Sequence, residues 1–202
     1  MTTEQNSRGI GYRLASVLTE VLSPAVIVVL LPLAVSWQAT EHDLLATGAW
    51  TLVVAVFYSV LPMVFLVRGA RRGRWDGHWV RQRERRLIPL LMCLASTMAG
   101  LVILLLGSAP TDVVALAWAM VATLVACILI TQYWKVSIHA AVAGGAAATM
   151  LLLYGLVMLP LLVLVLAVAW SRVRVADHTV AQVVAGSLVG PMAGGVVFLL
   201  LR

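Results

Sequence analysis

Residues 112–132 read DVVALAWAMVATLVACILITQ, an apolar run whose only charge is at its first position. A helix of that length rises about 30 Å, which is the thickness of a bilayer's hydrocarbon core. Similar apolar runs occupy about 14–36, 45–67, 87–107, 138–154, 157–171 and 178–200. Because unpaired backbone groups are costly in lipid, each run is expected to form a helix. The sequence therefore predicts an all-α integral membrane protein with a bundle of about six or seven transmembrane helices.

The composition agrees with this class and excludes an ordinary soluble domain. Hydrophobic residues make up 62% of the chain and charged residues 11%, whereas a soluble domain carries about 25% charged residues. We expect a polar N-terminal tail at residues 1–12 and a single transmembrane helical domain at residues 13–202. The lipid bilayer around it is expected to be a bacterial plasma membrane.

The formal charge of +6 is concentrated in the loop between the second and third apolar runs. Eight arginines there oppose Asp76 and Glu84: Arg68, Arg71, Arg72, Arg74, Arg81, Arg83, Arg85 and Arg86. Basic loops stay in the cytoplasm, so the loop predicts a cytoplasmic N-terminus and an external C-terminus. No aromatic platform or soluble module accompanies the charge, so no nucleic-acid partner is expected. An anionic substrate is the functional alternative to a purely topological role.

Two further polar clusters are predicted to share the face of the arginine loop. The hairpin 87–132 leaves that face and returns to it, and the next hairpin does the same. Residues 135–139 and residues 171–178 are therefore expected beside the loop. The helices of the second hairpin are short, about 25 Å against a core of about 30 Å, which predicts a pocket recessed below the membrane surface. Residues 140–148 are nearly all Ala and Gly, which allows a neighbouring helix to approach closely.

The first of these clusters has the residue types that bind and act on phosphate. Ser137 stands where a helix begins, which is a natural N-cap position. His139 lies in the first turn, where it could protonate a leaving oxygen and later activate water. Lys135 flanks both of them, either as a phosphate ligand or as a lysine that reaches the membrane surface.

The second cluster offers a nucleophile beside a cation. At positions i and i+4 of a helix, His178 and Gln182 share a face. Arg172 precedes them, and its planar guanidinium suits phosphate oxygens. An imidazole held there could attack phosphorus and form a phosphohistidine. No recognisable metal-binding spacing occurs in the sequence, and we expect neither a metal nor another cofactor.

The stretch Ser171-Arg172-x5-His178-x3-Gln182 resembles the Ser-Arg-x5-His-x3-Asp motif of the type 2 phosphatidic acid phosphatase and haloperoxidase superfamily. Residues 135–139, Lys-Val-Ser-Ile-His, resemble its Pro-Ser-Gly-His motif. Its first motif, Lys-x6-Arg-Pro, has its nearest fit in His78-x6-Arg85 followed by Arg86. The resemblance covers roughly residues 76–190.

By this resemblance His178 is the nucleophile, His139 is the general acid, and Arg172 and Ser137 bind phosphate. It also implies that further cations or polar groups hold the phosphate: Lys135, Arg85, Arg86 and His78. The implied activity is metal-independent hydrolysis of a membrane lipid phosphate or an isoprenoid (di)phosphate. Because a cytoplasmic site would meet soluble prenyl diphosphates, an isoprenoid substrate is at least as well supported as a glycerolipid.

Gln182 is the main departure from the family pattern, because it replaces the aspartate that orients the nucleophilic histidine. A glutamine carbonyl can accept the Nδ1 proton but supplies no negative charge, and an Asp-to-amide change in a serine-protease triad costs about 10⁴ in rate. Two alternatives follow. A prenyl diphosphate lyase or terpene cyclase needs no phosphohistidine, and a non-catalytic binder of lipid phosphates needs no nucleophile.

Overall fold

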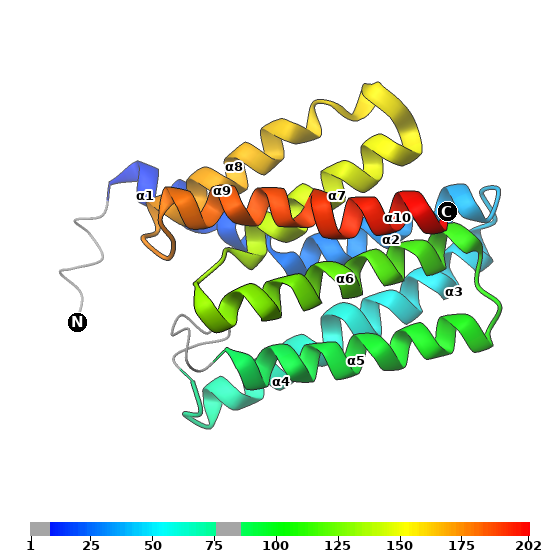
Figure 1. The fold of residues 1–202 in the computed structure, drawn as a ribbon, viewed down its shortest axis with the longest axis horizontal. Helices are drawn as coiled ribbons and strands as arrows, with labels where there is room; N and C mark the ends of the chain where they lie inside the picture. Colours follow the sequence, from blue (N-terminus) through cyan, green and yellow to red (C-terminus); the bar gives the residue numbers. More distant parts are fainter. Residues whose placement is uncertain (1–8, 76–85) are drawn as a thin grey trace.

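The structure, a computed structural model, describes residues 9–75 and 86–202, and within these ranges it contains helices and no strand. The α-helices are α1 (Ile10–Val21), α2 (Pro24–Ala39), α3 (Leu44–Val54), α4 (Leu61–Arg71), α5 (Leu87–Leu106), α6 (Thr111–Tyr133), α7 (Ile138–Tyr154), α8 (Leu161–Arg174), α9 (Val180–Val189) and α10 (Val196–Leu201). Two π-helices, η1 (Ala55–Val60) and η4 (Gly190–Gly195), continue longer spans, and a 3-10 turn, η3 (Gly155–Met158), follows α7. In the described part, five helices are long and apolar enough to cross a membrane, or six if α1 and α2 form one broken span. The predicted all-α membrane bundle is confirmed (Figure 1).

The first apolar run differs from the expected single helix. α1 and α2 meet at an angle of 47°, and Ser23 between them has extended backbone angles. Pro24 causes this break, because its ring disfavours helical geometry at the preceding residue and it has no N–H to donate. α1 then packs against the end of α8, where the Thr19 hydroxyl donates to Ser171 Oγ at 3.2 Å.

Two prolines inside spans coincide with the π-helices. Pro62 lies just after η1, and Pro191 lies within η4. A proline in a helix interior removes one hydrogen bond and clashes with the carbonyl four residues earlier. A π turn is wider than an α turn and makes room for the proline ring, so the span continues instead of ending. Residues 44–71 therefore form one span, slightly longer than the predicted run 45–67.

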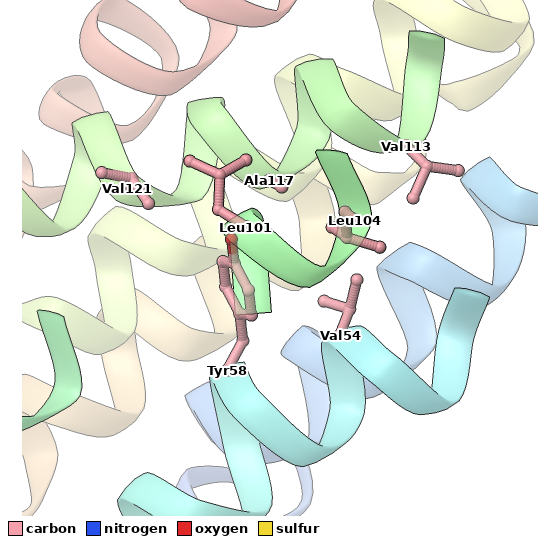
Figure 2. Packing of buried hydrophobic residues seen from close by; sticks show 7 residues of the cluster. All are labelled: Val54, Tyr58, Leu101, Leu104, Val113, Ala117 and Val121. Atoms are coloured by element: carbon pink, nitrogen blue, oxygen red, sulfur yellow. The ribbon is translucent and has the colours of Figure 1, made fainter. Parts of the chain in front are cut away.

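An apolar cluster holds α3, η1, α5 and α6 together. Figure 2 shows its buried side chains facing one another between these helices: Val54, Tyr58, Leu101, Leu104, Val113, Ala117 and Val121. These positions lie in the middle and far half of the bundle, away from the arginine loop. The cluster therefore fixes α5 and α6 as a hairpin and leaves the opposite end of the bundle for polar groups.

The closest helix contact joins α7 to the span formed by α9, η4 and α10. A side-chain carbon added at Gly190 would overlap the carbonyl oxygen of Ala141, and one added at Gly186 would overlap the carbonyl oxygen of Ser137. The two backbones therefore touch, as the Ala- and Gly-rich run at 140–148 predicted. Small residues permit this approach in membranes, where helix association depends on close packing.

The connection between α7 and α8 also follows the prediction. Gly155 has a φ of 77°, a conformation that glycine adopts without a steric penalty. The chain then passes through η3 and begins α8 after Pro160. α8 has 14 residues, a length of about 21 Å. A helix this short does not cross a hydrocarbon core of about 30 Å alone.

We predict that Gly190→Ala destabilises the protein, because the added methyl group has no room against the α7 backbone. The expected loss is about 1–3 kcal/mol, typical of overpacking. Gly145→Ala is the matched control on the facing helix, where the added carbon would have its nearest neighbours at 3.5 Å, an ordinary contact. Thermal unfolding in detergent checks both variants. Equal melting temperatures for the two would contradict a backbone contact at Gly190.

Candidate functional site

Three polar segments meet at one end of the bundle, where α6, α8 and α4 end and α5, α7 and α9 begin (Figure 1). Arg86 donates from Nη1 to the carbonyl oxygen of Val136 at 3.2 Å. Lys135 donates from Nζ to the carbonyl oxygen of Asp177 at 2.6 Å. The N–H of Ser137 donates to the carbonyl oxygen of Gln182 at 3.2 Å. The predicted convergence of residues far apart in sequence is confirmed.

The nucleophile candidate sits just outside α9 and not on it. α9 begins at Val180, so His178 lies in the preceding loop and the expected i, i+4 pairing on one helix is wrong. The pair still forms, with His178 Nδ1 at 3.2 Å from Gln182 Oε1. The reason is a capping box, in which the Thr179 side chain accepts from the N–H of Gln182 and Gln182 Oε1 accepts from the N–H of Thr179 at 3.2 Å.

The capping box decides which end of the glutamine amide faces the histidine. Only the oxygen can accept from the N–H of Thr179, so Oε1 points back toward the loop, where it also meets His178. Nδ1 of His178 must then carry the proton that it donates to this oxygen. Nε2 keeps its lone pair, which is the tautomer that a nucleophilic histidine requires.

The charge state of His178 favours the same role. Burial, and after it the nearby cations Arg86, Lys135 and Arg172, lower the pKa of this imidazole to about 3, although the hydrogen bond to Gln182 acts in the opposite direction. The imidazole is therefore neutral at physiological pH and able to attack an electrophile. Because the folded-state pKa lies below the unfolded value near 6.5, folding stability is lost as the pH falls from about 6.5 toward 3.

Arg172 lies in the last turn of α8 and pairs with Asp177. Nη2 of the arginine is 2.6 Å from Oδ2 of the aspartate, and the two side chains are 3% and 6% exposed. A buried pair of this kind is poorly screened by water. Asp177 directs its carboxylate to Arg172, and no electrostatic effect of it on the pKa of His178 is resolved, although the two residues are adjacent.

A single cavity of about 210 Å³ joins this polar end to the interior of the bundle. Its polar wall contains Arg86, His139, Arg172 and His178. The remaining wall is mostly apolar and comes from α2, α4, η1, α5, α6 and α7, with side chains such as Ile27, Val28, Met63, Leu66, Leu90 and Leu124. The cavity is thus cationic at one end and apolar along the rest.

The cavity is about as deep as one leaflet of a bilayer. On α7 its wall runs from His139 to Thr149, ten residues or about 15 Å of helix. On α6 it runs from Leu116 to Cys127, a similar rise. Half of a hydrocarbon core of about 30 Å is about 15 Å. The length of the cavity is therefore about half the thickness of a bilayer's hydrocarbon core.

Three of the other predicted site residues, Ser137, Lys135 and Gln182, are described but are not part of the cavity wall. Ser137 is fully buried and caps α7, with its Oγ accepting from the N–H of Ala140 at 3.4 Å. This confirms the predicted N-cap. The hydroxyl oxygen of Ser137 is therefore hydrogen-bonded to the backbone of α7. Lys135 donates to the backbone carbonyl of Asp177, and Gln182 is hydrogen-bonded to the imidazole of His178. His78 and Arg85 fall outside the described residues.

Three parts of the site were not predicted from the sequence. Thr179 was overlooked although Thr-Val-Ala-Gln at 179–182 is a readable capping-box pattern. The pairing of Asp177 with Arg172 was not predicted, because it depends on how the chain turns after α8. The apolar wall from α2, η1 and α4 lies before residue 76 and so outside the resemblance.

Among residues 9–75 and 86–202, no three His, Cys, Asp or Glu side chains form a group that could hold a metal ion. Comparisons with models of protein families, with curated proteins and with solved structures give no match.

We predict that Gln182→Glu raises the pKa of His178, because the variant keeps the length and the capping box and adds a negative charge at Nδ1. The expected rise is about one to three pH units. Gln182→Met, which has a similar length but accepts only weakly, is the control and lowers the pKa. NMR titration of ¹⁵N-labelled histidine in detergent measures both. A wild-type His178 imidazole that is charged at pH 7 would contradict the assignment.

Proposed function

We propose that the protein is a membrane phosphatase that hydrolyses a lipid or isoprenoid (di)phosphate through a phosphohistidine on His178. The observation that carries this proposal is the cavity that joins cationic groups to an apolar chamber one leaflet deep. An amphiphile with an anionic head and one hydrocarbon chain fits both parts. The neutral imidazole at the junction supplies the nucleophile.

The reaction uses two histidines in two steps. In the first step the Nε2 lone pair of His178 attacks phosphorus, a P–N bond forms, and the P–O bond to the lipid breaks. The lipid oxygen leaves with that electron pair and takes a proton from His139. In the second step water attacks phosphorus, gives a proton back to His139 and breaks the P–N bond. Phosphate leaves, and His178 regains its lone pair.

The cations hold the phosphate and stabilise the charge that develops on it. Arg86 and Arg172 line the cavity together with His178. Lys135 is not part of the cavity wall, but its charge also lowers the pKa of the His178 imidazole. Guanidinium groups suit phosphate because they offer several N–H donors in one plane. Gln182 contributes its carbonyl dipole to the phosphoimidazolium and no full charge, so the turnover rate is expected to be lower than with an aspartate.

The shape of the cavity favours a single-chain substrate. Its volume of about 210 Å³ is below the usual range of about 300–1,000 Å³ for ligand pockets, although it extends about 15 Å along α7. One prenyl or acyl chain suits such a narrow space better than two acyl chains. The positive-inside bias of the arginine loop favours a site at the cytoplasmic face, where prenyl phosphates would be accessible from solution.

A product assay in detergent tests the function. The purified protein is given farnesyl diphosphate, farnesyl phosphate and phosphatidic acid, and inorganic phosphate, diphosphate and the organic product are measured. We expect phosphate together with free farnesol from the single-chain substrates. Removing the nucleophile in His178→Ala should lower the rate at least a hundredfold, because the covalent pathway is lost.

The other products identify the alternatives. Diphosphate with a hydrocarbon from farnesyl diphosphate would indicate a lyase or cyclase, and binding without any product would indicate a carrier or binder. His42→Ala is the matched control, because His42 is exposed in the turn after α2 and lies outside the cavity. Full phosphatase activity in His178→Ala would overturn the proposed mechanism.

A further inference from the structure

Hydroxyl side chains interrupt the mostly apolar wall of the cavity at its deep end, far from Arg86 and Arg172. The threonines among them lie about ten residues from the polar ends of their helices, a depth of about 15 Å. All of these side chains are more than nine-tenths buried. They are Tyr58 and Ser59 in η1, Thr97 in α5, Thr123 in α6 and Thr149 in α7.

A contact between η1 and α5 brings Tyr58 and Thr97 to one depth. Ser96 Oγ donates to the carbonyl oxygen of Phe57 at 2.6 Å, so the next residue of each helix lies at the same level. These next residues are Thr97 and Tyr58, and both line the cavity.

Thr123 of α6 lies at this level as well. It is within one turn of Val121, which packs in one cluster with Tyr58 (Figure 2). The neighbouring backbone comes from η4, where a carbon added at Gly194 would overlap the hydroxyl oxygen of Thr123. Both π-helices, η1 and η4, therefore border the deep end of the cavity, and π turns are frequent at functional sites.

Tyr58 differs from its neighbours in its hydrogen bonding. Ser59, Thr97 and Thr123 each donate to a backbone carbonyl oxygen at 2.9 Å. The hydroxyl of Tyr58 is buried and has no hydrogen-bond partner among the described residues. A buried hydroxyl without a partner is unfavourable, and most such groups are satisfied by protein, water or a ligand. The deep end therefore offers a donor at Tyr58 together with threonine oxygens that can still accept.

We propose that the deep end of the cavity is a second polar subsite, which binds a hydroxyl group at the far end of the substrate's chain. A hydroxyl can accept from Tyr58 and donate to a threonine oxygen, so one small group satisfies both. The phosphate and this hydroxyl lie about 15 Å apart, at the two ends of the cavity. The inference rests on the proposed function and narrows its substrate to a single-chain phosphate with a terminal hydroxyl.

The test compares two phosphonates that the protein cannot hydrolyse. Dodecylphosphonate ends in a methyl group and ω-hydroxydodecylphosphonate ends in a hydroxyl, and each extends about 15 Å, the depth of the cavity. Calorimetry in one detergent gives both dissociation constants for the wild-type protein and for Tyr58→Phe. The variant removes only the hydroxyl, so the affinity ratio should move about three- to tenfold toward dodecylphosphonate. Partition of the ligands into micelles cancels, because the same pair is measured for both proteins.

Tyr154→Phe is the matched control. Its hydroxyl donates to the carbonyl oxygen of Ala34 at 2.7 Å, and Tyr154 is not part of the cavity wall, so the affinity ratio should stay unchanged. Thermal unfolding without ligand is the second measurement. Tyr58→Phe should melt no lower than wild type, because it removes a hydroxyl that has no partner among the described residues. Tyr154→Phe loses a hydrogen bond and should melt lower.

The remaining outcomes overturn the inference. An affinity ratio in Tyr58→Phe within twofold of wild type would mean that the subsite does not recognise the chain's hydroxyl, and a lower melting temperature in that variant would then mean that Tyr58 binds water only. An equal shift of the ratio in Tyr154→Phe also contradicts the subsite. If both ligands bind and the ratio does not respond to Tyr58→Phe, the phosphatase proposal still stands. If neither ligand binds to the wild-type protein, both proposals fail.

Discussion

The backbone contact between α7 and α9 is the constraint on which the site depends. A carbon added at Gly186 of α9 would overlap the carbonyl oxygen of Ser137, the N-cap of α7. One added at Gly190, where η4 continues α9, would overlap the carbonyl oxygen of Ala141 in α7. Held this close, the N–H of Ser137 reaches the carbonyl oxygen of Gln182, and the first turn of α7 lies beside the loop before α9. His139 and His178 therefore line one cavity although they are far apart in the chain. Wider helix spacing would separate the two histidines.

Burial of charge gives this cluster its chemical character. Three cations and one carboxylate lie near an imidazole that burial keeps neutral. Cations in such surroundings are weakly screened by water, and in the proposed function they attract an anionic head group that enters the cavity. The apolar wall beyond the cations then adds hydrophobic stabilisation along the chain of a lipid. In the proposed function, the head and the tail of the substrate are bound by different forces at opposite ends of one cavity.

The sequence predicted the helical bundle, the shared face of the polar clusters and the close packing at residues 140–148, because each depends on composition or spacing along the chain. It missed the break at Pro24 because hydropathy averages over such a residue. It also placed His178 on a helix, whereas the capping box at Thr179 starts α9 two residues later, at Val180. The pairing of Arg172 with Asp177 depends on a left-handed Ala176, which no propensity predicts. The apolar part of the cavity is assembled from helices outside the motifs, and only their packing reveals it.

The central claim is that His178 carries the phosphoryl group during turnover. It is tested most directly by incubating the protein with ³²P-labelled farnesyl phosphate, quenching in alkali, which preserves phosphohistidine, and mapping the label by mass spectrometry. The proposed mechanism predicts labelling of His178 at Nε2, with more label in His139→Ala because the second step then lacks its base. Label on any other residue, or turnover during which His178 never becomes labelled, would contradict it.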